Sequence, residues 1–416
     1  MIGIRVGLPE PGLRQIERLW MRSVELFAGA GGLAMGMANA GFQHAAVIEW
    51  DADACNTFRE NQRRSLHAMQ AWPLHQADVR NFDYGSVGGE VAMVSGGPPC
   101  QPFSLGGKHR GDQDMRDMFP EAVRAVRELR PKAFIFENVK GLMRESFSSY
   151  FEYIYLQLTS PSLQRQNSEG WKEHRASLEK YRTSNRGHSE YNVVYRLLNA
   201  ADYGVPQKRE RVFFVGFRAD LGVEWSFPEP SHSADELFRS QWVTGEYWDQ
   251  HGITKKHRPQ PPERFEIRVE ALKRGKLFDC DQLPWMTVRD ALKDLPDPEN
   301  RKKNAITNHE FIPGAKIYPG HVGSPLDEPA KTLKAGDHGV PGGENMLARA
   351  DGSVRYFTVR EAARLQTFPD GYIFPNSWNK SMRQLGNAVP VQLAEVVSKS
   401  VALTLRSTKG SKPRNG

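Results

Sequence analysis

The stretch that decides the fold is Val24–Gly32, with the sequence VELFAGAGG. A short β-rich apolar run leads into a glycine-rich turn, and a helical pattern follows at Leu33–Ala40. Glycines let the backbone turn tightly and approach a ligand closely, and the first residues of the following helix offer free N–H groups. The stretch therefore predicts a strand, a ligand-facing turn and a helix.

Outward from this stretch, short apolar runs alternate with helix-length segments through residue 217. Strand–helix alternation predicts a mostly parallel, doubly wound α/β sheet with helices on both faces and ligands at the carboxyl ends of the strands. The expected strands are Ser23–Phe27, Ala45–Glu49, Val91–Ser95, Ala133–Glu137, Val193–Leu198 and Val212–Gly216. The expected helices between them are Leu33–Ala40, Ala52–Gln62 and Met118–Leu129.

Composition narrows the class of protein. The 416 residues are 39% hydrophobic, which excludes disorder of the whole chain. The apolar runs are short and flanked by charge, so we expect no membrane span and no secretion signal. Three cysteines cannot build a disulfide framework, and we expect no metal site and a cytoplasmic setting. The net charge of +7 fits a polyanionic partner and an ordinary basic enzyme equally well.

The organisation of the chain changes at several points. We expect an N-terminal extension at 1–22, a first domain at 23–219 with a polar surface insertion at about 160–189, and a return of helical periodicity at 355–406. We expect residues 220–354 to form a second, smaller, irregular domain. It should be basic, because Lys255–Lys276 contains eight Lys or Arg and only three Glu. Residues 407–416 form a basic tail.

Acidic and aromatic side chains follow the next strands. Glu49 ends a strand where a carboxylate can accept from ribose hydroxyls, Trp50 can stack on a base, and Asp78 can accept from an adenine amine. Ala34 and Met35 stand where the dinucleotide fingerprint needs a further glycine. A nucleoside cofactor without a pyrophosphate fits better, although such a turn is often only a tight connection.

A second loop carries a framed cysteine. Ser95–Ser104, with the sequence SGGPPCQPFS, follows a strand and presents Cys100 after two prolines. A lone cysteine is usually a small buried hydrophobe, but this setting favours a nucleophile.

Two further segments supply charged partners for such a nucleophile. Glu137 ends an apolar strand, where desolvation raises a carboxyl pKa and makes the group a proton donor. Alternation places Gln207, Arg209 and Arg211 on one face, where arginines can hold a carbonyl or a phosphate. The plainer alternatives are a helix-capping glutamate and a solvated charge run.

Taken together, these segments resemble the DNA (cytosine-5) methyltransferase family of bacterial type. The matches are collinear: Phe27–Gly32, Pro98–Gln101, Glu137–Val139, Gln207–Arg211, Thr358–Gln366 and Gln384–Pro390. The resemblance implies a Rossmann-like S-adenosylmethionine-dependent catalytic domain in two parts, with 220–354 between them as the target-recognition domain. The long 160–189 insertion and the N-terminal extension depart from the shorter members.

The resemblance also implies roles for individual residues. Cys100 would add to carbon 6 of a flipped-out cytosine, Glu137 would protonate the ring nitrogen, and Arg209 and Arg211 would position and polarise the base and orient the glutamate. S-adenosylmethionine, converted to S-adenosylhomocysteine, would be held by Phe27, Gly29, Gly31, Gly32, Leu33, Glu49, Trp50, Asp78, Val79, Pro99, Met118 and Asn387. Contacts to DNA would come from Gln101, Ser104, Gln207, Thr332 and Leu333.

The implied substrate is a specific sequence in double-stranded DNA, modified by a monomer that associates with the nucleoid through DNA. The sequence leaves open whether a restriction endonuclease accompanies the enzyme. One alternative is the same chemistry on transfer RNA, which the length of 220–354 disfavours. A catalytically silent DNA-binding member would have lost Cys100, Glu137 or Arg209, and a dinucleotide oxidoreductase would need a different glycine spacing.

Overall fold

The computed structural model describes residues 21–99, 117–166, 168–184, 188–273, 281–300, 306–319, 322–335 and 345–408. Its centre is a seven-stranded sheet, and β7 alone in it runs antiparallel to its neighbours. In spatial order the strands are β3 (Leu74–Gln76), β2 (Phe42–Glu49), β1 (Met21–Leu26), β4 (Met93–Gly96), β5 (Ala133–Val139), β7 (Glu210–Arg218) and β6 (Tyr191–Asn199). The expected α/β sheet and its strands are confirmed.

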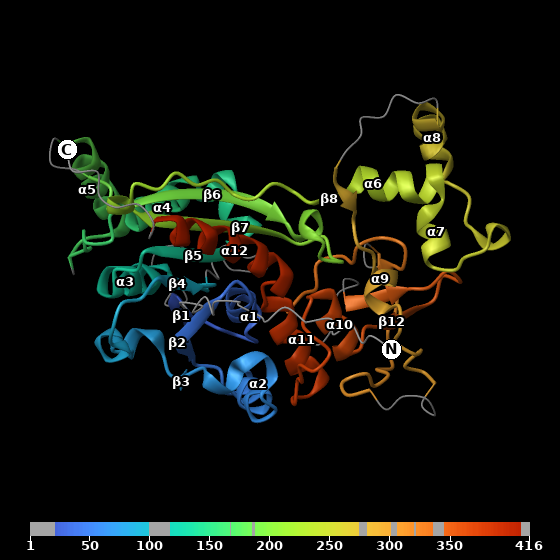
Figure 1. The fold of residues 1–416 in the computed structure, drawn as a ribbon, viewed down its shortest axis with the longest axis horizontal. Helices are drawn as coiled ribbons and strands as arrows, with labels where there is room; N and C mark the ends of the chain where they lie inside the picture. The colour runs from blue at the N-terminus through green and yellow to red at the C-terminus, as the bar shows by residue number, and fades with distance from the viewer. Residues whose placement is uncertain are drawn as a thin grey trace, which may run out of the picture.

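Successive apolar side chains along a strand point to opposite faces of the sheet, and both faces are covered by helices. On β5, Phe134 and Phe136 pack with α3 (Phe119–Leu129) and α4 (Ser148–Thr159) on one face. Ala133 and Ile135 belong to the core on the other face, with α1 (Gly32–Asn39) and α12 (Val391–Thr408). Figure 1 shows the C-terminal helices beside α1, so the two ends of the chain build one layer.

Helices α10 (Val359–Leu365) and α11 (Trp378–Asn387) complete the C-terminal part, and α2 (Ala52–Arg63) follows β2. Thr358 caps α10 through a capping box with Glu361, as a Thr-x-x-Glu pattern predicts. Trp378–Thr408 is long and apolar enough to cross a membrane by length and composition, in contrast to the sequence expectation. Burial of 61% of its apolar window and packing of α12 on α1 account for this character.

The insertion contains a helix, α5 (Trp171–Thr183), which packs on α4. Tyr150 on α4 meets Trp171 edge-on, with ring centroids 5.4 Å apart. The Tyr153 hydroxyl and His174 Nδ1, also from the two helices, lie 2.9 Å apart. The insertion is therefore joined to the helices that cover the large sheet by a largely buried aromatic cluster.

The described residues between 220 and 354 form small elements. Figure 1 shows α6, α7 and α8 standing apart from the large sheet, whereas Val288 and Leu347 belong to the same core cluster as Ala362 of α10 and Leu385 of α11. The elements are β8 (His232–Ser233), α6 (Ala234–Arg239), α7 (Glu246–Gln250), α8 (Glu266–Lys273), β9 (Leu283–Pro284), α9 (Val288–Leu292), β10 (Ser324–Pro325), β11 (Met346–Ala348) and β12 (Val354–Tyr356). β8 pairs with β9, and β10, β11 and β12 form a three-stranded sheet. Strand β12 crosses the domain boundary expected at 354.

Candidate active site

The glycine-rich turn lies at the carboxyl end of β1. Gly29 and Gly31 have φ values of 53° and 81°, and the turn closes through a 2.8 Å bond from Gly31 N–H to the Ala28 carbonyl. A Cβ on Gly32 would lie 2.1 Å from the Val389 carbonyl oxygen, so the C-terminal segment packs directly on the turn. At Gly29 the nearest such contact is 4.0 Å away. Among the described residues, the turn is closed on the Gly32 side and has no close contact at Gly29.

Glu49 holds the turn from the neighbouring strand. Its carboxylate accepts from Gly29 N–H at 2.7 Å and from the N–H groups of Trp50 and Asp51 at 2.9 and 2.8 Å. Burial raises the Glu49 pKa, and these hydrogen bonds oppose the rise. A carboxylate has about four acceptor positions, so one remains for a ribose hydroxyl.

The other expected adenosine contacts surround this point. The Trp50 side chain is 71% exposed, as a stacking surface requires. Asp78 caps the 3₁₀ turn Val79–Asn81 and forms an ion pair with Arg80, whose hydrogen bonds hold the Asp78 pKa below its usual range. Val79 is buried in the core.

The loop that leads to Cys100 is described only as far as Pro99. The Pro99 carbonyl accepts from Met118 N–H at 3.1 Å, so these two expected cofactor residues are neighbours. Asn138 donates to the Pro98 carbonyl at 2.9 Å and thereby fastens the loop to the end of β5. Cys100, Gln101 and Ser104 lie outside the described residues.

Glu137 lies on β5 beside this loop. Its Oε1 forms an ion pair with Arg211 Nε at 2.8 Å, and a Cβ on Gly97 would lie 3.2 Å from its Oε2. Only 6% of Glu137 is exposed. Burial raises the Glu137 pKa, whereas the charges of Arg211 and Arg209 act in the opposite direction. The carboxyl group thus faces the segment before Cys100 with its protonated form favoured by burial.

Arg209 and Gln207 have fully buried side chains that contact protein groups. Arg209 donates to the backbone carbonyls of Leu333, Gly386 and Ala388 at 3.2, 2.7 and 2.8 Å. Gln207 accepts from Leu333 N–H at 2.9 Å and donates to the Leu365 carbonyl at 3.2 Å. These two side chains join the catalytic domain to both later parts of the chain.

Of the remaining predicted residues, Thr332, Leu333 and Asn387 adjoin the same junction. Thr332 donates to the Lys208 carbonyl at 2.7 Å, while Leu333 is 1% exposed. Asn387 is exposed at the end of α11, and Leu33 is buried under α12. Phe27, just before the turn, has a φ of 53° and packs partly on the core.

Glu25, which lies on β1 immediately before Leu26, is not among the predicted site residues. Its side chain is fully buried and accepts a hydrogen bond from Ser95 on β4. A charged residue inside an apolar strand was the available signal. No group of three or more His, Cys, Asp or Glu side chains within the described ranges could hold a metal ion.

A glycine-rich turn beside an acidic strand end, on a sheet of this order, defines a Rossmann-like methyltransferase fold. The sequence model of the C-5 cytosine-specific DNA methylase family matches residues 21–161 and 167–402, and the chain belongs to that family. It is a bacterial DNA (cytosine-5) methyltransferase.

Known proteins resemble the chain over most of its length. It is 31% identical over 398 residues to the Type II methyltransferase M.PspPI of Psychrobacter sp., covering 92% of this chain and 79% of the relative. M.AplI of Arthrospira platensis is 31% identical over 391 residues, with 94% and 88% covered. The solved structure of Schizosaccharomyces pombe Dnmt2 methyltransferase superposes with a TM-score of 0.53 at 16% identity, covering 93% of this chain and 98% of that chain, and supports the fold alone.

Proposed function

We propose that this enzyme transfers a methyl group from S-adenosylmethionine to carbon 5 of a cytosine flipped out of double-stranded DNA, through a covalent Cys100 adduct at carbon 6. The observation that carries the mechanism is the buried Glu137–Arg211 pair, which faces the Gly97–Pro99 segment leading to Cys100. Pairing inside a duplex makes the base unreachable, so it must be extruded at a cost of a few kcal/mol.

The residues around the glycine-rich turn fit the cofactor. The open side at Gly29 admits a ligand against the backbone, Glu49 retains an acceptor position, and Trp50 offers an exposed ring. When bound, S-adenosylmethionine supplies an electrophilic methyl group. Glu49 would orient the ribose and Trp50 would cover one face of the adenine, while Asp78 and Val79 would frame its edge.

The chemistry assigns a task to each polar group. Carbon 5 of cytosine is not nucleophilic, but addition of the Cys100 thiolate to carbon 6 places electron density on it. Protonation of ring nitrogen 3 by Glu137 neutralises the charge that this addition creates. Carbon 5 would then take the methyl group, with the sulfur–methyl bond broken and S-adenosylhomocysteine as the leaving group. Loss of the carbon 5 proton to a base would then allow elimination of the Cys100 thiolate and restore the aromatic ring.

We propose different tasks for the two arginines. Arg211 is paired with Glu137 and would orient that carboxyl group and polarise the base. Arg209 would hold the surrounding segments in place rather than contact the base, because its terminal nitrogens already donate to three backbone carbonyls. Gln207 and Leu333 would likewise support the junction, whereas Thr332, Gln101 and Ser104 would reach the DNA.

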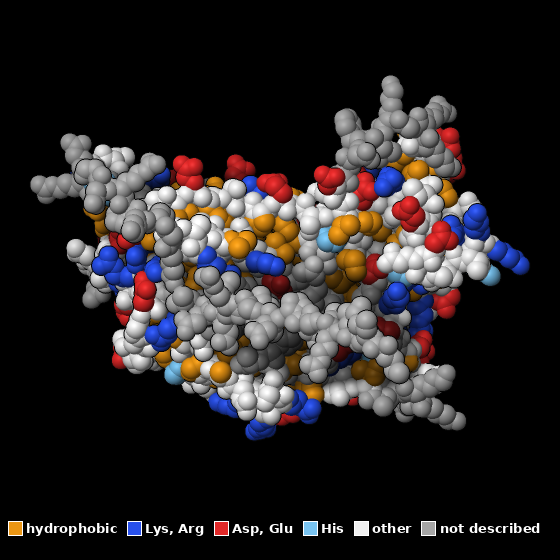
Figure 2. Space-filling view, in the orientation of Figure 1, with side chains coloured by type: hydrophobic (Ala, Val, Ile, Leu, Met, Phe, Trp, Pro, Cys, Tyr) orange, Lys and Arg blue, Asp and Glu red, His pale blue; other side chains and the backbone are white. Residues whose placement is uncertain are grey.

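We propose 220–354 as the recognition domain, acting on a specific sequence with the protein as a monomer. Its basic segment is partly neutralised internally, since Arg258 and Arg268 form ion pairs with Asp249 and Asp235. Figure 2 shows the basic and acidic side chains of the described residues interspersed over one face of the molecule. Recognition of DNA would therefore depend on local groups, with affinity falling as salt rises.

A trapping experiment tests the mechanism. Replacing the carbon 5 hydrogen of the target cytosine with fluorine blocks the final elimination, because fluorine cannot leave as a cation. Wild-type protein with S-adenosylmethionine should form a denaturation-resistant complex with such a duplex, and Cys100→Ala should not, although it still binds S-adenosylhomocysteine and DNA. Methyl transfer by Cys100→Ala, or a strong preference for transfer RNA, would contradict the proposal.

A further inference from the structure

A tyrosine from the C-terminal part of the chain reaches the glycine-rich turn. The Tyr372 hydroxyl donates to the Ala30 carbonyl at 2.6 Å, across 342 positions of sequence. Both residues are buried, with 0% and 1% of their surfaces exposed. Ala30 lies between Gly29 and Gly31, the two glycines that carry positive φ. The bond therefore fixes the centre of the turn.

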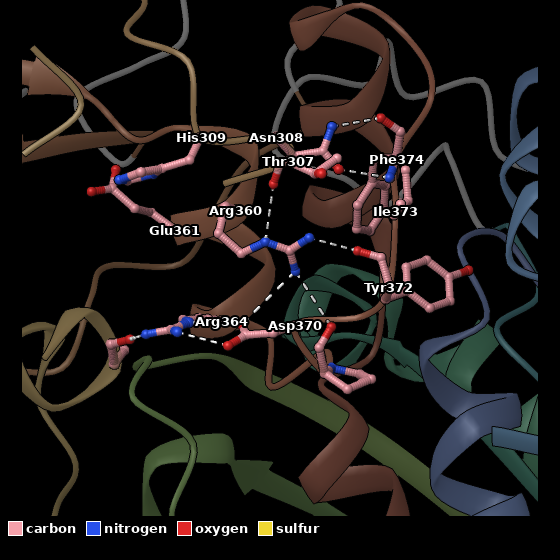
Figure 3. Close-up of polar contacts among 12 residues, drawn as sticks. Thr307, Asn308, His309, Arg360, Glu361, Arg364, Asp370, Tyr372, Ile373 and Phe374 are labelled. Atoms are coloured by element: carbon pink, nitrogen blue, oxygen red, sulfur yellow. Dashed lines mark hydrogen bonds and ion pairs between the residues drawn. The ribbon is translucent and has the colours of Figure 1, made fainter. Parts of the chain in front are cut away.

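The segment that carries Tyr372 is itself held by a buried arginine. Arg360, 1% exposed, donates to the Tyr372 carbonyl at 2.9 Å and to the Thr307 carbonyl at 3.3 Å. Figure 3 shows the Arg360 guanidinium group between the segments that carry Thr307 and Tyr372, with the Tyr372 ring directed away from it. Arg360 thus joins the segment to residues that precede β10 in the 220–354 region.

Asn308 makes a second connection between the same segments. Its side chain donates to the Phe374 carbonyl at 2.8 Å and accepts from Phe374 N–H at 2.9 Å (Figure 3). A pair of bonds to one residue fixes both the position and the direction of the backbone. The stretch 372–374 is consequently held from the 220–354 side while Tyr372 holds the turn.

We propose that Tyr372 is a positioning residue for the cofactor-binding turn, and that Arg360 and Asn308 make this positioning depend on the recognition region. The inference rests on the proposed function, which places the cofactor at this turn. Two side chains pin the turn: Glu49 holds the Gly29 N–H, and Tyr372 holds the Ala30 carbonyl. Glycine has more backbone freedom than any other residue, so a turn of this composition must be restrained to bind tightly.

Loss of the hydroxyl has a defined consequence. Tyr372→Phe keeps the ring and its contacts with Phe368 and Phe374 but leaves the Ala30 carbonyl buried without this donor. The Ala30 carbonyl then either stays buried without a hydrogen bond, which destabilises the turn, or moves with the backbone toward water. In either case binding of the cofactor must restore the geometry, and affinity falls.

The test measures the dissociation constant of S-adenosylhomocysteine by calorimetry. Tyr372→Phe should weaken binding about tenfold, the effect of losing one buried hydrogen bond. The matched control is Tyr191→Phe, because the Tyr191 hydroxyl donates to the Pro131 carbonyl at 2.8 Å from a ring that is 2% exposed. Pro131 precedes β5, at the amino edge of the sheet and opposite the turn. The control should lose similar thermal stability with unchanged affinity.

A second variant keeps the inference testable if Tyr372→Phe does not fold. Asn308→Gly removes both bonds to Phe374, and glycine readily adopts the φ of 67° found there. We expect about threefold weaker S-adenosylhomocysteine binding from this variant, whose changed residue is far along the chain from the turn. Unchanged affinity in the folded variants would overturn the inference. Failure of the wild-type protein to bind would instead contradict the proposed function.

Discussion

Glu25 provides a prediction in which the sign of a pH effect distinguishes two states of a buried carboxyl group. Its side chain is completely buried on β1, and Ser95 donates to Oε2. Oε1 has no hydrogen-bond partner among the described residues. Burial raises the Glu25 pKa from 4.5 to about 8, and the bond from Ser95 acts in the opposite direction. We predict that Glu25→Gln changes stability in opposite directions at low and high pH.

The magnitude follows from the two pKa values. Below pH 4.5 the carboxyl group is protonated in both the folded and the unfolded chain, so its ionisation costs nothing. As the pH rises from 4.5 to about 8, the unfolded chain releases a proton that the folded chain retains, and the folded state loses stability. One pKa unit corresponds to 1.36 kcal/mol, so the loss approaches about 5 kcal/mol above pH 8 and is about 3 kcal/mol at pH 7.

Glutamine cannot ionise, so the variant escapes this loss. Its amide oxygen can still accept from Ser95, but its NH₂ group has no ready partner in the core, at a cost of about 1–3 kcal/mol. The variant should therefore be less stable than the wild type at pH 5 and more stable at pH 9. The two stability curves should cross between about pH 5 and pH 7, where the loss in the wild type equals the cost of the amide.

Urea unfolding at several pH values from 5 to 9 measures the free energy of unfolding of both proteins. Their difference isolates Glu25, because the other titrating groups contribute equally to both. Ser95→Ala is the matched variant: without its hydroxyl the Glu25 pKa rises further, and the pH-dependent loss should extend to higher pH. A difference between wild type and Glu25→Gln that stays constant from pH 5 to 9 would refute the reasoning. It would mean that Glu25 keeps one protonation state throughout this range.

Three further predictions concern the site. Glu137→Gln should lower kcat by about 100-fold or more, the range of general acid catalysis, while S-adenosylhomocysteine affinity stays within about twofold; an equal loss in both would indicate a general disruption. Gly32→Ala places a Cβ 2.1 Å from the Val389 carbonyl and should cost about 1–3 kcal/mol, seen as a lower Tm by calorimetry. Trp50→Ala removes a side chain that is 71% exposed, so Tm should hold while cofactor affinity falls about tenfold.

Local sequence patterns predicted the sheet well because its signals are local. A continuous apolar run, Ala133–Phe136, marks β5, as in strands buried on both faces, and the observed range, Ala133–Val139, extends the expected one by two residues. Helix α4 has no such signal. Its aromatic residues, such as Tyr150 and Tyr153, favour strands by propensity, and only their packing against α3 and α5 explains the helix.

Those residues of the candidate site that have ionisable side chains near strand ends could be predicted from the sequence. Glu49 ends β2 and Glu137 lies two residues before the end of β5, and the carboxyl ends of parallel strands meet at one edge of a sheet. Both residues therefore could be assigned to the site before their contacts were known. The hydrogen bond from Tyr372 to Ala30 could not be predicted, because its acceptor is a backbone carbonyl, which every residue has.

Arg209 shows why contacts of this kind matter for the whole enzyme. Burial lowers its pKa well below the usual value, and the neighbouring Arg211 acts in the same direction. A buried guanidinium group is costly unless its donors find acceptors; the carbonyls of Leu333, Gly386 and Ala388 accept from the two terminal nitrogens of Arg209, while Nε has no partner among the described residues. These carbonyls belong to two segments that follow Arg209 by more than 120 positions. The charge can therefore be buried beside Glu137 only when the segment around Leu333 and the end of α11 have docked, which makes assembly of the site depend on segments that follow Arg209 by more than 120 positions.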